Sequence, residues 1–261
     1  RFGLPPAWYT GIREDSKGAL WIGSFREGLF RFDQRGLTNL FRDRIQKVVA
    51  LEFDERGALW FGPNSSRVYR YDGSDLREFD AKDGLPNAWF SSIRRGPDGK
   101  DWLALRGSAF LGGALATFDG KRFANVTAER GWENHAVLDM DADTNGVMWV
   151  ATRGGLLRYT GQQAAWYSKA DGLAHDALWT VRVGSKGSVW CGTAAGVSHH
   201  DGLAWATLDT RDGLPGNEVY AIKEGANGEI WFGTDGGVSR YRPNPIAPWA
   251  RIAEVQTEQT F

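Results

Sequence analysis

Residues 228–241 read Gly-Glu-Ile-Trp-Phe-Gly-Thr-Asp-Gly-Gly-Val-Ser-Arg-Tyr, and versions of this stretch recur along the whole chain. Its Gly-x-x-Trp core occurs six times, with the tryptophans 39 to 47 residues apart. These residues, called the repeat tryptophans below, are Trp21, Trp60, Trp102, Trp149, Trp190 and Trp231. A constant period near 40 residues indicates a repeat architecture.

Each repeat predicts four short strands. In the fourth repeat, residues 138–143 alternate between apolar and polar side chains, as in a strand with one buried face, and residues 219–224 are the corresponding run of the last repeat. A Gly-containing turn follows, then a strand around Trp231 and a third strand that ends in Tyr241. A weaker fourth strand leads to an Asp-Gly-Leu-Pro joint in several repeats, as at residues 212–215. Four antiparallel strands per repeat predict an all-β chain, a β-propeller with six four-stranded blades.

Length and composition limit the alternatives. Six blades account for nearly all of the 261 residues, which favours one domain over residues 1–245 and a separate segment over residues 246–261. The net charge of −1 argues against nucleic acid as a partner and against direct membrane contact. Cys191 follows a repeat tryptophan and is expected to be buried in a blade. The sequence shows neither a membrane span nor a signal peptide, and it opens inside a repeat motif, so we expect a fragment.

Three features together resemble the two-component regulator propeller repeat. They are the Gly-x-x-Trp-x-Gly core, the Arg-Tyr or Arg-Phe strand that follows it, and the Asp-Gly-Leu-Pro joint, and the resemblance covers about residues 3–245. It implies the periplasmic, extracytoplasmic sensor region of a hybrid two-component regulator that recognises oligosaccharides or related ligands. It also implies that residues 246–261 begin a following β-sandwich, with a C-terminal linker or a closing strand as the alternatives. Family propellers usually have seven blades, so this chain could also be part of a seven-bladed ring.

A binding site is expected on the loops. In a propeller, the turns between second and third strands and the segments that join blades emerge at the same end. The predicted ligand-binding residues on these segments are Arg26, Arg67, Arg106, Arg153, Asp235, Trp8, Trp89, Trp132, His135 and His175. Arginine offers planar donors for a carboxylate or sulfate, and tryptophan offers a flat face for a sugar ring. Alternatively, these arginines pair with nearby acids and these tryptophans cover blade edges.

Metal binding and catalysis have weaker support in the sequence. Residues 141–146 match the opening of a calcium loop, but Thr152 stands where the loop's last ligand belongs, and a plain hairpin turn is the other interpretation. His199 and His200 are expected within a blade, whereas His135 and His175 lie on joining segments. We therefore expect no catalytic residue, no cofactor and no metal. The alternatives are a scaffold or dimerisation propeller, with self-association through the parent receptor, and a lyase resembling the streptogramin-inactivating enzymes.

Overall fold

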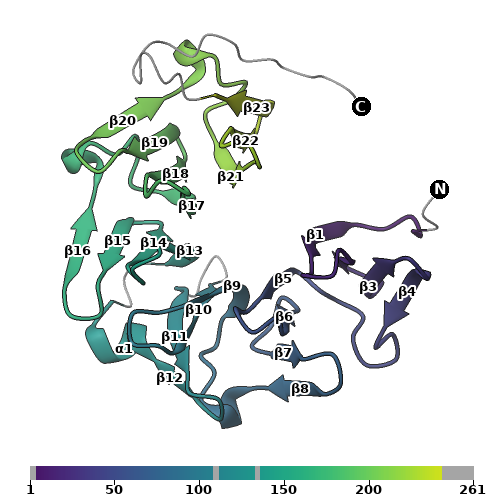
Figure 1. Cartoon of the computed structure of the whole chain (residues 1–261). Coiled ribbons are helices and arrows are strands. Elements are labelled where there is room, and N and C mark those ends of the chain that lie inside the picture. The colour runs from purple at the N-terminus through teal and green to yellow at the C-terminus, as the bar shows by residue number, and fades with distance from the viewer. Residues whose placement is uncertain (1–3, 108–111, 133–135, 243–261) are drawn as a thin grey trace. The chain divides into compact units, whose positions relative to one another are not determined.

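The computed structural model describes residues 4–107, 112–132 and 136–242 (Figure 1). The chain divides into two compact units, residues 1–95 with 99–134 and residues 96–98 with 135–261. Both are built from antiparallel sheets, called blades 1 to 6 in chain order, which confirms the predicted all-β propeller architecture. The predicted extent of the domain, residues 1–245, stays a prediction.

The first unit holds blades 1 to 3, each with four strands. Blade 1 consists of β1 (Tyr9–Glu14), β2 (Leu20–Ser24), β3 (Gly28–Asp33) and β4 (Gly36–Leu40). Blade 2 consists of β5 (Ala50–Phe53), β6 (Leu59–Gly62), β7 (Val68–Tyr71) and β8 (Leu76–Phe79). Blade 3 consists of β9 (Trp89–Arg95), β10 (Asp101–Arg106), β11 (Ala114–Phe118) and β12 (Phe123–Asn125), followed by the short helix α1 (Val126–Arg130).

The second unit holds blades 4 to 6. Blade 4 consists of β13 (Val137–Ala142), β14 (Met148–Thr152), β15 (Gly155–Tyr159) and β16 (Ala164–Tyr167). Blade 5 consists of β17 (Leu178–Val183), β18 (Val189–Thr193), β19 (Gly196–His200) and β20 (Trp205–Leu208). Blade 6 shows β21 (Val219–Glu224), β22 (Ile230–Thr234) and β23 (Gly237–Tyr241), and its predicted fourth strand falls outside the described residues.

Within each unit the first strands of successive blades lie side by side. β5 contacts both β1 and β9 in the first unit, and β17 contacts both β13 and β21 in the second. In every blade the strands follow in chain order from this first strand across the sheet. Residues at the start of neighbouring first strands can therefore combine into one surface.

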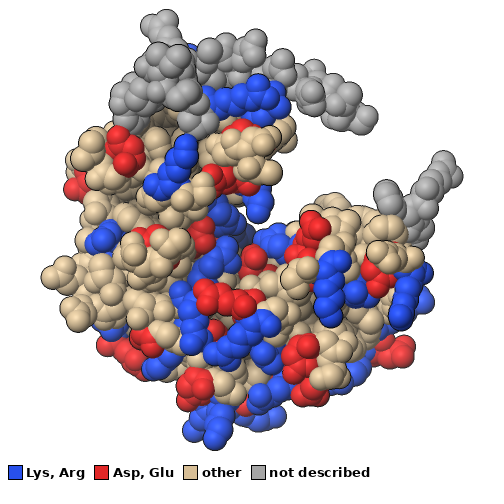
Figure 2. All heavy atoms as spheres, viewed as in Figure 1, with Lys and Arg blue, Asp and Glu red and all other residues tan. Residues whose placement is uncertain are grey.

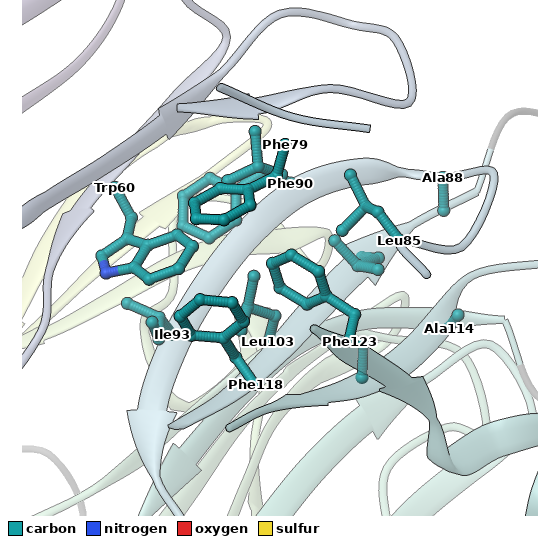
Figure 3. Close-up of a cluster of buried hydrophobic side chains, with 13 residues drawn as sticks. Trp60, Phe79, Leu85, Ala88, Phe90, Ile93, Leu103, Ala114, Phe118 and Phe123 are labelled. Atoms are coloured by element: carbon teal, nitrogen blue, oxygen red, sulfur yellow. The ribbon is translucent and has the colours of Figure 1, made fainter. Parts of the chain in front are cut away.

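The second strands of blades 1 to 5 are buried on both faces, which explains their mostly apolar sequences. In blade 2, Leu59 and Phe61 pack with Trp21 of blade 1, whereas Trp60 between them packs with blade 3. Figure 3 shows the Trp60 indole beside the rings of Phe79 and Phe118 in this second cluster. Alternate residues of one strand thus fill the spaces on either side of its sheet.

Blade 6 differs from the other blades at its repeat tryptophan. Trp231 is 37% exposed, whereas the other five repeat tryptophans are buried. Val238 on the adjacent β23 is 51% exposed, although its counterparts Val68 and Val197 are fully buried. The repeat tryptophans that have a following blade in their own unit pack against that blade; they are Trp21, Trp60, Trp149 and Trp190.

The turn before the first repeat tryptophan, Trp21, is fixed by two features. Its glycine has a positive φ, 80° at Gly18, which only glycine adopts without strain. The Asp15 carboxylate accepts hydrogen bonds from the Lys17 and Ala19 amides and from Trp21 Nε1, each at 2.9 Å. Burial alone would raise the pKa of Asp15, but the hydrogen bonds from Trp21 and the two amides outweigh it and lower the pKa. The turn and the tryptophan therefore form one local unit.

The Asp-Gly-Leu joints are short capped helices, which the sequence analysis treated only as links. They are the 3-10 helices η1 (Ala81–Asp83), η2 (Lys169–Asp171) and η3 (Thr210–Asp212). Each has a reciprocal capping box, in which the last helical Asp accepts from the backbone N–H of the N-cap residue. The glycine that follows is left-handed, and the next leucine, Leu85, Leu173 or Leu214, is buried. The motif therefore turns the chain and inserts an apolar side chain between blades.

Candidate functional site

The two sets of loops predicted to share an end do so in blades 1, 4, 5 and 6. The turn between the second and third strands is joined by a backbone hydrogen bond to the segment that enters the first strand. These bonds run from the amide to the carbonyl in the pairs Phe25 to Trp8, Arg153 to Ala136, Ala194 to Ala177 and Asp235 to Glu218, at 2.9 to 3.1 Å. This prediction is confirmed, and the end in question is called the loop end below.

In blade 1, Arg26 and Trp8 are both exposed at the loop end. The Trp8 ring meets Phe25 edge-on, with the ring centroids 6.1 Å apart. Phe25 also lies under the ammonium group of Lys47, which is 4.4 Å from its centroid. The structure thus brings the Trp8 ring next to the turn that carries Arg26.

The other predicted residues of the first unit have neighbours of different kinds. Arg67 Nη1 lies 3.2 Å from Glu78 Oε1, as expected if these arginines pair with nearby acids. Arg106 and Trp89 are directly opposite each other on β10 and β9. Trp132 is half-buried, and the Arg130 guanidinium lies 5.5 Å from its ring centroid.

In the second unit, the predicted residues Arg153 and Asp235 lie at the loop end. Arg153 is exposed, and its guanidinium carbon lies 5.8 Å from the ring centroid of Trp179. Asp235 Oδ1 accepts from the Glu218 amide at 3.1 Å. His175 is exposed, and its Nδ1 accepts from the Ala177 amide at 2.9 Å. His135 lies outside the described residues.

Two aromatic residues of this surface were missed by the sequence analysis. Trp179 and Tyr220 each stand eleven residues before a repeat tryptophan, in β17 and β21. The pairing with the second strand skips both, between Leu178 and Thr180 and between Val219 and Ala221. Such a β-bulge adds an unpaired residue and changes the direction of its side chain. The available signal was an aromatic residue at this position, but it occurs only in the last two repeats.

Tyr220 is held by an acid of the same surface. Its hydroxyl donates to Glu218 Oε2. This hydrogen bond, together with smaller contributions from burial and from the charges of Glu218 and Asp235, raises the pKa of Tyr220. The phenol is therefore neutral at physiological pH, and half of the residue (50%) is exposed.

The sequence analysis also missed a second set of charged residues, which lies deeper along the first strands. Eight residues before the repeat tryptophans, the sign of charge alternates over five blades. The residues are Arg13, Glu52, Arg94, Asp141, Arg182 and, in the sixth blade, Lys223.

These charges form ion pairs between neighbouring blades. Glu52 Oε2 lies 2.9 Å from Arg13 Nη2 and 3.7 Å from Arg94 Nη1, so one carboxylate links three blades. In the second unit, Arg182 Nη1 donates to Asp139 Oδ2 at 2.7 Å. Figure 2 shows basic and acidic side chains interspersed over the face in view. We interpret this set as a structural belt, because its carboxylates already have partners within the protein.

The turn at residues 141–146 has the contacts of a hairpin turn. Asp143 Oδ1 accepts from the Asn145 and Val147 amides at 2.8 and 2.9 Å, the pattern seen at Asp15. Asp141 Oδ2 accepts from the Val183 amide at 3.0 Å. Among the described residues, no three His, Cys, Asp or Glu side chains gather closely enough to hold a metal ion. Cys191 is buried in β18 as expected, and burial raises the pKa of its thiol.

His199 lies in β19 as predicted and replaces an arginine. In blades 1, 2, 4 and 6 the residue opposite the repeat tryptophan is an arginine over its ring, namely Arg31, Arg70, Arg158 and Arg240. In blade 5, His199 stacks on Trp190, with the centroids 3.7 Å apart. Burial lowers the pKa of His199 to about 4, with a smaller lowering from His200 and an opposing effect of Asp201.

We expect His199→Arg to reduce the loss of stability in mild acid. Because the folded protein binds the His199 proton only near pH 4, the unfolded chain takes it up first, from about pH 6.5. This contribution to stability is therefore complete above pH 6.5 and is lost as the pH falls towards 4. The melting temperature should fall less between pH 7 and 4.5 in the variant than in the parent chain. Parallel curves for the two proteins would contradict this account.

The fold and this arrangement of loops define a β-propeller with six blades. Residues 3–26 and 213–236 match the family described as the two component regulator propeller. The first and last repeats of the chain are thus similar to the two component regulator propeller repeat. A search of curated protein sequences finds no match. Within the described parts of the chain, no helix has the length and apolar character to cross a membrane.

Solved structures share the fold. The extracellular domain of a hybrid two component system from B. thetaiotaomicron is 23% identical with a TM-score of 0.75, and the match covers 92% of this chain and 33% of that one. A second such domain from the same organism is 21% identical with a TM-score of 0.61, covering 92% and 39%. Virginiamycin B lyase from Staphylococcus aureus is 17% identical with a TM-score of 0.75, covering 98% and 86%. The chain spans about a third of the length of the extracellular domains.

Proposed function

We propose that this chain is a ligand-sensing propeller from the extracytoplasmic part of a two-component signalling receptor. The match of both end repeats to the two component regulator propeller family carries the proposal. The likeness in fold to extracellular domains of hybrid two component systems supports it. We infer that the chain recognises its ligand without catalysing a reaction. We also infer a periplasmic or other extracytoplasmic location.

The loop end is the proposed binding surface. Its backbone is the same in the blades that share the turn-to-segment hydrogen bond, whereas its side chains differ from blade to blade. A uniform frame with variable side chains suits recognition of an oligosaccharide or a similar small ligand. A bound ligand would favour one state of the receptor only to the extent that it binds that state more tightly.

A thermal-shift screen against acidic and neutral oligosaccharides tests this function. A ligand at about 100 times its Kd stabilises the folded state by about 2.7 kcal/mol, which is about 5 to 10 °C for a chain of this size. We expect such a shift for at least one glycan and a smaller one in Arg106→Ala or Arg153→Ala. Arg56→Ala is the control, because Arg56 is exposed in the β5–β6 turn away from the loop end.

A cooperative melt that no glycan shifts would contradict oligosaccharide sensing by this chain. The scaffold or dimerisation function would then be favoured, and the exposed Trp231 and Val238 would mark a surface for it. Equal loss of the shift in Arg56→Ala and the loop-end variants would contradict the placement of the site. The likeness to the lyase is a likeness of fold, and an enzyme remains the second alternative.

A further inference from the structure

The β-bulge of the first strand recurs in five blades, and in each of them it changes the direction of one side chain. The skipped residues are Thr10, Ser91, Leu138, Trp179 and Tyr220. Only in blades 5 and 6 is this residue aromatic. Since β17 and β21 lie side by side, the two bulges bring the two rings together, with centroids 5.9 Å apart and planes at 54°. The rings thus form a bent aromatic surface instead of a closed stack.

The charges around this surface are arranged with opposite signs at its two ends. Beside Trp179 lies the exposed guanidinium of Arg153, which has no ion pair with any residue that the structure describes. Beside Tyr220 lies the Glu218 carboxylate, and the Glu218 amide is bound by Asp235. A ligand lying across the rings would therefore meet a cation at the Trp179 end and carboxylate acceptors at the Tyr220 end.

We propose that Trp179, Tyr220 and Arg153 form a binding subsite for an acidic sugar, with its carboxylate or sulfate at Arg153. This assignment rests on the proposed sensing function. The apolar faces of the sugar rings lie on the two aromatic side chains, and the hydroxyl groups donate to Glu218 or Asp235. Tryptophan and tyrosine provide flat, rigid contact area, and an exposed guanidinium provides charge-assisted hydrogen bonds to the anion.

Calorimetric titration of the 261-residue chain with short oligosaccharides that carry uronic acids or sulfates tests the subsite. Neutral oligosaccharides of the same length are titrated in parallel. We expect Trp179→Ala and Tyr220→Ala each to weaken binding of the acidic glycan about tenfold or more, as for buried aromatic contacts at binding sites. Arg153→Ala should weaken the acidic glycan by a similar factor and leave the neutral one unchanged. Added salt should weaken acidic-glycan binding to the parent chain, because it screens the exposed charge.

Two controls separate the subsite from general damage. Trp231→Ala removes a partly exposed tryptophan of blade 6 that lies in β22 and not at the bulge, and it should bind as the parent does. Tyr220→Phe keeps the ring and loses only the hydroxyl bond to Glu218, so it should keep most of the affinity. Unchanged melting temperatures show that the variants are folded.

The outcomes distinguish this subsite from the sensing function. If an acidic glycan binds but Trp179→Ala and Tyr220→Ala bind as well as the parent, the subsite is wrong and the sensing function stands. If neutral and acidic glycans bind equally and Arg153→Ala has no effect, the assignment of an acidic ligand is wrong. If no glycan binds the parent chain, both the subsite and oligosaccharide sensing are overturned.

Discussion

Trp60→Ala is expected to destabilise the chain by about 3 to 5 kcal/mol, the range for replacing a large aromatic core residue. Trp60 is fully buried and stacks on Phe79, with centroids 5.7 Å apart and planes at 12°. Its Nε1 donates to Asp54 Oδ2 at 2.9 Å. The substitution therefore leaves a cavity between two blades and removes a donor from a buried carboxylate. Urea unfolding measures the change, and the melting temperature should fall by about 10 °C.

Trp231→Ala is the matched control for Trp60→Ala. It changes the same residue at the same position of the repeat, but Trp231 is 37% exposed. We expect a clearly smaller loss than for Trp60→Ala, because more than a third of Trp231 is already exposed to solvent and its truncation leaves no enclosed cavity. Equal losses in the two variants would contradict the conclusion that a repeat tryptophan stabilises the propeller through the following blade.

Gly84→Ala is expected to cost about 3 kcal/mol. Gly84 ends η1 with φ at 86°, a conformation that costs other residues about 1 to 2 kcal/mol. A Cβ built there would lie 2.4 Å from the Phe123 carbonyl oxygen, so the backbone of β12 would have to move as well. Equilibrium unfolding in urea provides the measurement.

Gly57 separates the two contributions. Its φ is 80°, but a Cβ would meet nothing within 4 Å. Gly57→Ala should cost only the conformational part, and Gly57→Asn less still, because asparagine tolerates left-handed backbone. Gly84→Asn should remain strongly destabilising. A similar loss for Gly84→Asn and Gly57→Asn would show that the contact with Phe123 does not matter.

Most of the fold could be predicted from the sequence because every repeat contains the same local sequence pattern. The glycine three residues before each repeat tryptophan predicted a turn, and all six of these glycines have φ between 72° and 80°. The capped helices of the joints were not predicted, although Asp80 and Asp83 have the spacing of a capping box. They are a single turn long, and so short a helix leaves no hydrophobic periodicity to detect.

The candidate site could be predicted less well, because the repeat pattern indicates which residues lie on loops but not which strand residues face the same surface. Arg153 and Asp235 stand on turns, where the sequence predicted binding residues. Trp179 and Tyr220 stand within strands, where alternation gives no reason to expect an outward aromatic, and only the bulge redirects them. The contact between Arg153 and Trp179 joins blades 4 and 5, and the sequence of one repeat contains no information about that pairing.

The side chains of one second strand pack on both sides of its sheet, and this also determines how the blades of a unit unfold. Blade 2 contributes Leu59 and Phe61 to one cluster and Trp60 to the next, so its loss exposes the blades on both sides. Within the described residues, blade 1 packs against a neighbouring blade on one side only. In an array where each member is stabilised by its neighbours, opening is easiest at an end and hardest in the middle. Amide hydrogens of β6 should therefore exchange with solvent much more slowly than those of β2, although each of the two strands is paired with a strand on both sides in its own sheet.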